Sequence, residues 1–120
     1  MLNPPPVDEE NKEHEFLQKI EDLILEKYLD SDSSVFQLAE DLNFSRSSLY
    51  RKIKMHTDLS INEFVRSVRI KKVAELIAQK NITISEAAYQ AGFNDLKYFR
   101  EAFVKQFGTT PSEYKKKMKK

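Results

Sequence analysis

The sequence of 120 residues contains no cysteine and few residues that interrupt helices, with two glycines and four prolines. The absence of cysteine excludes disulfides and thiolate chemistry, and it suits a reducing compartment. Long stretches without Gly or Pro favour helices over a turn-rich all-β fold. No apolar run approaches the ~18 residues that would span a bilayer, and no signal peptide precedes the first expected helix. We therefore expect a cytoplasmic protein with no membrane partner.

The net charge of +1 conceals a strong asymmetry along the chain. Residues 1–42 hold 3 Lys and 12 Asp/Glu, a net charge of −9. Residues 43–120 hold 17 Lys/Arg and 7 Asp/Glu, a net charge of +10. Such a split indicates a polyanion-binding region beside an acidic one. A solvated charge bias without any partner is the alternative interpretation.

Apolar periodicity and helix caps predict an all-α fold of seven helices. Residues 1–14, which include Pro4-Pro5-Pro6, are interpreted as a flexible leader or linker. An amphipathic helix is expected from Glu15 to about Leu29, with an acidic face directed away from any nucleic acid. Each of two short helices leads through a turn into a second helix, and a long helix over residues 61–80 separates the two pairs. Three capping boxes open later helices: Ser60 with Glu63, Thr83 with Glu86, and Thr110 with Glu113.

The chain contains an internal repeat, which divides it into comparable halves. Asn43, where a left-handed backbone is expected, matches Gly92 at an offset of 49. Ser45 matches Asn94 at the same offset, and both are predicted as N-caps. Further on, the core positions match at an offset of 50: Leu49 with Phe99, and Ile53 with Phe103.

The repeat predicts two helix-turn-helix subdomains, residues 15–60 and residues 81–120 with a basic tail, joined by the central helix. Ile61 to Gln79 would span about 28 Å as a helix, whereas successive major-groove faces on one side of DNA lie roughly 34 Å apart. We expect recognition helices at about 45–56 and 95–107 to enter adjacent major-groove segments of double-stranded DNA. A duplicated helical bundle without a ligand is the alternative.

The segment Gly92–Phe103 (GFNDLKYFREAF), followed by Phe107–Tyr114 (FGTTPSEY), resembles the signature of AraC/XylS-type transcription regulators. Ser45–Lys54 resembles their first recognition helix, and the likeness covers about residues 15–118. The sequence departs from the family pattern in four places: Asn43 and Asp58 replace a common Gly, Ile61 a common Pro, and Val104 a common Lys.

The resemblance implies sequence-specific regulation of transcription by a bacterial protein, without a cofactor. It also implies RNA polymerase as a partner, and a sensory, receiver or dimerisation region outside this sequence. The proline-rich leader would suit a junction to such a region, including that of a two-component response regulator. The intact regulator would be able to form a homodimer.

Side chains that face away from the predicted core are the candidates for DNA contact. They are Arg46, Ser47, Tyr50, Arg51 and Lys54 in the first unit, and Asp95, Leu96, Lys97, Arg100 and Glu101 in the second. Arg51 and Arg100 are expected in register on paired helices, each binding a guanine or a phosphate. The candidate phosphate-binding residues, at helix N-termini or with a basic side chain, are Ser45, Asn94, Lys105 and Thr110.

An enzyme and a protein adaptor are the competing classes. The two histidines, His14 and His56, lie 42 positions apart without recognisable catalytic partners. The sequence has no Gly-rich phosphate loop and no metal-ligand cluster, so we expect neither a catalytic residue nor a metal. A helical module that binds another protein, through the acidic first helix, remains the alternative to DNA binding.

Overall fold

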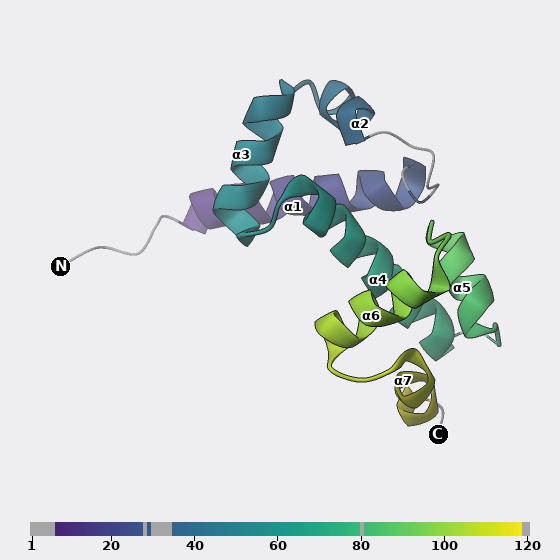
Figure 1. Cartoon of the computed structure of the whole chain (residues 1–120). Coiled ribbons are helices and arrows are strands. Elements are labelled where there is room, and N and C mark those ends of the chain that lie inside the picture. The colour runs from purple at the N-terminus through teal and green to yellow at the C-terminus, as the bar shows by residue number, and fades with distance from the viewer. Residues whose placement is uncertain (1–6, 28, 30–34, 80, 119–120) are drawn as a thin grey trace.

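The computed structural model describes residues 7–27, 29, 35–79 and 81–118, which form seven α-helices and no strand (Figure 1). The prediction of an all-α fold with seven helices is confirmed. The helices are α1 (Val7–Lys27), α2 (Val35–Asp41), α3 (Arg46–Thr57), α4 (Ile61–Gln79), α5 (Ile84–Gln90), α6 (Leu96–Phe107) and α7 (Pro111–Met118).

Helix α4 is shared between two hydrophobic cores, one at each of its ends. Helices α1, α2 and α3 pack around its N-terminal half, and α5, α6 and α7 pack around its C-terminal half (Figure 1). Val68 is the last residue of α4 in the first core, and Ile70 is the first in the second core. This division explains the broad apolar surface of α4, because a helix that is covered from two sides needs more than one apolar stripe.

Helix α1 begins earlier than predicted. The structure places its start at Val7, so the interpretation of residues 7–14 as a flexible leader is wrong, and residues 1–6 lie outside the described part of the chain. Residues 7–14 contain neither Gly nor Pro, and they include three Glu and one Lys, which are good helix formers. The helix therefore extends upstream of the apolar stripe on which the prediction was based.

The two turns between paired helices have the same backbone geometry. In the first, the amide of Phe44 donates to the carbonyl of Ala39 (2.9 Å), and in the second the amide of Phe93 donates to that of Ala88 (3.0 Å). The expected left-handed residue is present in both, Asn43 at φ 62° and Gly92 at φ 94°. The repeat seen in the sequence is therefore a repeat of conformation.

The predicted N-cap hydroxyls are confirmed at Ser45, Ser60, Thr83 and Thr110, but only one of the three predicted capping boxes is reciprocal in the described residues. At Thr83 and Thr110 the described contacts form only the hydroxyl half of the box, and the Glu113 carboxylate accepts from Thr109 instead. Ser45 caps α3, and Ser60 and Glu63 form the complete reciprocal box at the start of α4, with both hydrogen bonds at 3.1 Å. The predicted cap of α6, Asn94, is wrong. Asp95 caps it instead, because its carboxylate accepts hydrogen bonds from the amides of Lys97 and Tyr98 at 3.0 and 3.2 Å.

This correction moves the insertion in the repeat by one residue. Ser45 corresponds to Asp95, so the whole of α3 aligns with α6 at an offset of 50. Arg51 then corresponds to Glu101, and Arg100 corresponds to Tyr50. The expectation that Arg51 and Arg100 are in register is therefore wrong.

Candidate nucleic-acid interface

Helix α3 presents a basic face to solvent. Leu49 and Ile53 are fully buried and anchor the helix on the first core, as predicted. The opposite side is exposed and carries four of the five predicted contact residues, Arg46, Ser47, Arg51 and Lys54. The ammonium group of Lys54 also donates to the carbonyl of Asp58 at the end of the same helix (3.0 Å).

Tyr50 and Leu96 were both predicted to face outward, and the structure corrects both. Each is half-buried and packs against the hydrophobic core of its own unit. The helical pattern does not decide which face these two residues occupy, because each lies on the border between the buried stripe and the exposed face of its helix.

Helix α6 presents an exposed face of mixed charge. Phe99 and Phe103 are fully buried, as predicted. The solvent side carries Lys97, Arg100 and Glu101. Asp95 is exposed too, but its carboxylate already accepts two amide hydrogen bonds as the N-cap. A carboxylate that caps a helix and repels phosphate is a weaker candidate for DNA contact than the three residues that follow it.

The four predicted phosphate-binding residues are all exposed, and they lie in different settings. The hydroxyl of Ser45 accepts from the amide of Ser48 (3.2 Å), and that of Thr110 accepts from the amide of Glu113 (3.1 Å). Both residues therefore serve as N-caps of helices whose first-turn amides point outward. Asn94 lies one residue before its helix cap, and Lys105 lies in the last turn of α6.

A group of polar residues joins α4 to α6, and sequence reasoning did not find it. The guanidinium of Arg66 donates to the hydroxyl of Tyr98 (3.0 Å), and Gln106 donates to the carbonyl of Ser67 (3.1 Å). Beside them a hollow of about 200 Å³ is lined by Arg66, Lys105 and Gln106, among others. Arg66 and Tyr98 are 32 positions apart, so no local sequence signal links them. These contacts hold α6 in a defined position on α4.

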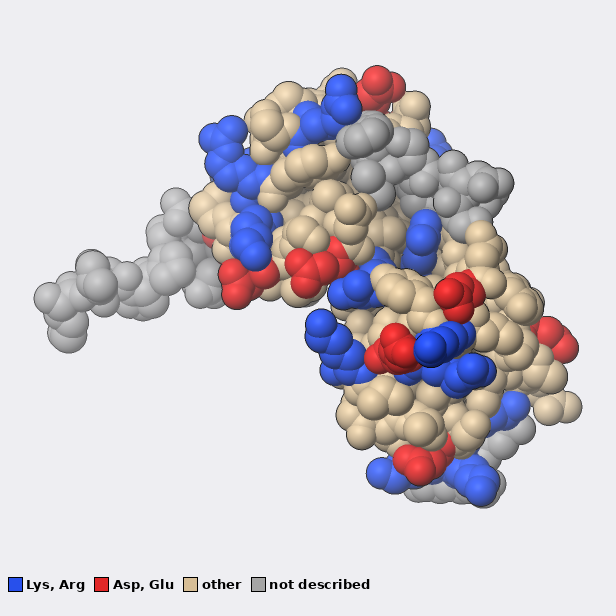
Figure 2. Space-filling model, in the orientation of Figure 1, with Lys and Arg blue, Asp and Glu red and all other residues tan. Residues whose placement is uncertain are grey.

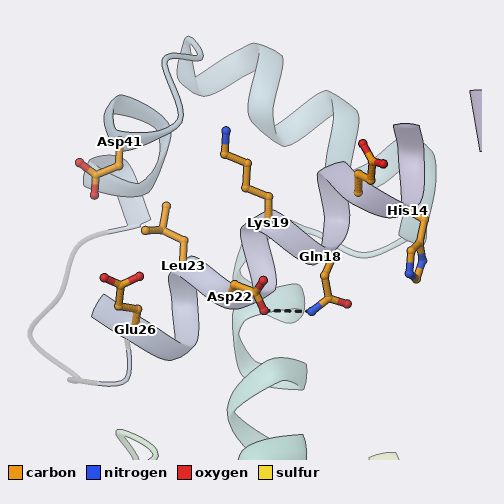
Figure 3. Close-up of a pocket in the computed structure, with 8 residues that line it drawn as sticks. His14, Gln18, Lys19, Asp22, Leu23, Glu26 and Asp41 are labelled. Atoms are coloured by element: carbon orange, nitrogen blue, oxygen red, sulfur yellow. Dashed lines mark hydrogen bonds between the residues drawn. The ribbon is translucent and has the colours of Figure 1, made fainter. Parts of the chain in front are cut away.

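Basic side chains gather on the surface over α3 and over α6 and α7, with acidic ones interspersed (Figure 2). The surface of α1 differs. A groove of about 470 Å³ between α1 and α2 carries four carboxylates and only one Lys (Figure 3). It is lined by His14, Glu15, Gln18, Lys19, Asp22, Leu23, Glu26 and Asp41. A polyanion is repelled from such a groove.

Two pairings on α4 change the pKa of their side chains. The hydrogen bond from the Ser60 amide, supported by the Ser60 hydroxyl, lowers the pKa of the Glu63 carboxyl. Glu21 on α1 accepts a hydrogen bond from Lys71 on α4 (2.9 Å), and it raises the pKa of the Lys71 ammonium. The Lys71 pair is partly exposed and contributes little to stability. It does, however, connect α1 directly with the middle of α4.

A membrane-spanning helix and a metal-ligand cluster are both absent from the described residues. None of their helices has the length and apolar character needed to cross a membrane. Nor do they contain a group of three or more His, Cys, Asp or Glu side chains placed to hold a metal ion. His56 lies 3.7 Å from Glu13, from ring nitrogen Nδ1 to carboxylate oxygen, and His14 lines the acidic groove.

Two helix-turn-helix units on one shared helix, each with an exposed second helix, define a double helix-turn-helix DNA-binding domain. Comparison with known proteins agrees: residues 38–117 match the family described as "Helix-turn-helix domain". The chain belongs to the AraC-type helix-turn-helix family of transcription regulators. Domains of this family are DNA-binding domains of transcription regulators.

Three similar proteins place the chain within that family. It is 33% identical over 103 residues to the Msm operon regulatory protein of Streptococcus mutans. It is 32% identical over 113 residues to a protein named Histidine kinase P4 of Formosa agariphila. Among solved structures it resembles the C-terminal domain of AraT, a response regulator from Geobacillus stearothermophilus, with a TM-score of 0.70 and 30% identity.

The extent of these matches differs. The alignment covers 86% of this chain but 37% of the Streptococcus protein, and 94% of this chain but 8% of the Formosa protein. The solved AraT domain and this chain each cover 84% of the other. The chain therefore spans little more than a third of the Streptococcus protein and a small fraction of the Formosa protein.

Proposed function

We propose that the chain recognises a specific double-stranded DNA sequence by placing α3 and α6 in two neighbouring segments of the major groove. The observation that carries this proposal is the repeated turn geometry. Two helices of twelve residues each follow the same hydrogen-bonded turn, and both present exposed basic side chains. Their shared helix α4 has 19 residues, or about 28 Å, near the roughly 34 Å between successive major-groove faces.

The residues of α3 and α6 divide into two roles. Arg51 and Arg100 are the strongest candidates for reading a guanine, because a guanidinium can donate to guanine O6 and N7 together. Lys54, Lys97 and Lys105 supply positive charge for phosphates and make the affinity dependent on salt. Glu101 is placed to accept from a cytosine amino group.

The corrected register makes the two halves of the proposed DNA site different. Arg51 on α3 corresponds to Glu101 on α6, and Ser47 corresponds to Lys97. Side chains of different chemistry at equivalent positions read different bases. We expect a site with two unlike blocks, which one chain binds in one direction.

Further partners follow from the relatives. AraT is named a response regulator, and its C-terminal domain is the part that matches this chain. We infer that the chain works as the output domain of a longer regulator with a sensory, receiver or dimerisation region. Acting on bacterial DNA, it would work in the cytoplasm and contact RNA polymerase.

The test is selection of bound sequences from a random duplex pool at about 150 mM salt, with excess nonspecific DNA. We expect two short unlike blocks whose centres lie about 10–10.5 base pairs apart. A single block would reject the two-helix arrangement. No enrichment from a folded sample would favour the competing class, a helical module that binds protein through the acidic face of α1.

A further inference from the structure

Gly92, in the turn of the second unit, packs directly against the backbone just beyond α1. A Cβ atom at position 92 would overlap the carbonyl oxygen of Leu29 and lie 2.9 Å from its carbonyl carbon. The same Cβ would lie 3.4 Å from the guanidinium carbon of Arg69 on α4. The end of the α1 segment, α4 and the second turn therefore meet at one point. The obstructing group is backbone, so it cannot rotate away as a flexible side chain would.

The other left-handed positions show that this contact is separate from the turn geometry. Gly108, at φ 74° after α6, has no atom within 4 Å of a Cβ built on it. In the first unit the equivalent positions are occupied by Asn43 and Asp58, at φ 62° and 63°. Asn and Asp tolerate this conformation. Gly92, at φ 94°, lies further from the left-handed region that Asn and Asp adopt, so its backbone and its contact with Leu29 both favour glycine, whereas at Gly108 the backbone alone does so.

Helix α1 is also fixed to the first unit. Close to the middle of α1, the ring of Phe16 packs edge to face against two rings of the first unit. Its centroid lies 5.6 Å from that of Phe44 and 6.3 Å from that of His56. At mid-helix, Glu21 pairs with Lys71 of α4 at 2.9 Å. Helix α1 thus contacts α3 and α4 in the first unit, and Leu29, two residues beyond its end, contacts the turn of the second unit. Together these contacts form a second connection between the two units, in addition to α4.

We propose that the contact between Leu29 and Gly92 is a positioning contact that sets the orientation of the second unit relative to the first. It thereby sets the spacing between the two DNA blocks that the chain reads. Hydrogen bonds from Arg66 and Gln106 fix α6 on α4, and the contact with Leu29 fixes the preceding turn at a separate point that belongs to the α1 side of the molecule. This inference rests on the proposed function for its consequence at DNA, but not for the geometry itself.

The first experiment compares Gly92→Asn with Gly108→Asp, which place in the second unit the residues that the first unit has at the same positions. The chain has no Cys, so Met55→Cys on α3 and Val104→Cys on α6, both at exposed positions, allow a pair of spin labels. The distance distribution between the labels then reports the orientation of the units without DNA. We expect Gly108→Asp to match the parent, and Gly92→Asn to shift or broaden the distribution.

Identical distance distributions for the parent and a folded Gly92→Asn variant would overturn the proposal. If Gly92→Asn does not fold, Leu29→Gly tests the same contact from the other side, because it loosens the chain at the carbonyl and leaves the turn untouched. We expect Leu29→Gly to broaden the distribution, and an unchanged distribution there rejects the proposal equally.

Selection of DNA with the same two glycine variants separates this inference from the proposed function. With Gly92→Asn we expect the favoured spacing between the blocks to change or relax, while the bases within each block stay the same. A change of bases within a block would instead assign Gly92 to base reading and contradict a purely positioning role. If the parent itself selects no two-block site, the proposed function fails, and the spin-label distances still decide whether the contact positions the units.

Discussion

The two helix-turn-helix units have the same turn geometry and differ in the side chains that form their hydrophobic cores. In the first unit Leu49 and Ile53 anchor the recognition helix, while Phe16 and Phe44 meet at the edge of the core. In the second, a continuous chain of rings fills the core: Phe93, Phe99, Phe103, Phe107 and Tyr114. Aliphatic and aromatic cores therefore support the same turn, because the turn is determined by its hydrogen bonds and one left-handed residue.

The exposed faces of the two units differ more than their backbones. Helix α3 carries four exposed cations and no exposed carboxylate, whereas α6 carries three exposed cations, Lys97, Arg100 and Lys105, beside Glu101. Lys52, the other cation of the second turn of α3, lies over the rings of Phe16 and Phe44 at 5.0 and 4.9 Å. A repeated framework therefore presents two unlike surfaces, which the proposed function assigns to two unlike blocks of DNA.

The largest expected effect distinguishes the two cores. Phe103→Ala removes the ring that contacts Phe99, Phe107 and Tyr114, and we expect it to lower the free energy of unfolding by about 3–5 kcal/mol. Ile53→Val at the equivalent position of the first unit should cost only about 0.5–1.5 kcal/mol. Urea unfolding followed by circular dichroism measures both. A cost below that of Ile53→Val for Phe103→Ala would mean that the aromatic cluster adapts to the lost ring.

The next effect concerns the two recognition faces. Arg100→Ala should weaken DNA binding by about 1–3 kcal/mol and relax the preference at one base of one block. Arg51→Ala should do the same in the other block, because the two arginines occupy non-equivalent positions on separate helices. Binding to a panel of single-base variants of the selected site measures both. A full-strength, unchanged preference in either variant would remove that arginine from the readout.

A smaller effect tests the corrected cap of α6. Asp95→Ala should cost about 1 kcal/mol of stability and speed amide hydrogen exchange at Lys97 and Tyr98, whose amides donate to the Asp95 carboxylate. Asn94→Ala is the matched control and should leave the exchange of those two amides unchanged. If these amides exchanged faster in the Asn94→Ala variant and at the parent rate in the Asp95→Ala variant, Asn94 would be the cap.

The smallest effect concerns the capping box that opens α4. Because the pKa of Glu63 is lowered in the folded state, its stabilising contribution is present above the unfolded-state pKa and lost as pH falls through the folded pKa. We expect Glu63→Gln to reduce the loss of stability on acidification below the ordinary carboxyl range. Thermal unfolding from neutral pH to about pH 2 measures it. Parallel curves for parent and variant would contradict the lowered pKa.

Most of the fold was predictable from the sequence because its signals are local. Leu49, Ile53, Phe99 and Phe103 lie on one face of a helix by spacing alone, and all four are buried. The capping box of Ser60 and Glu63 was readable for the same reason, since its partners lie three residues apart. The errors at Asn94, Tyr50 and Leu96 arose at borders, where a shift of one residue or a fraction of a turn changes the role of a side chain.

The sequence by itself determined the seven helices, the repeat, the basic face of α3 and the mixed charge of α6, because caps, periodicity and charge depend on neighbours within a few positions. Tertiary structure alone decided how the two units sit on α4. The bond between Arg66 and Tyr98 and the contact between Leu29 and Gly92 join residues 32 and 63 positions apart. Such pairs leave no periodic trace in a single sequence, and chain folding alone brings them together.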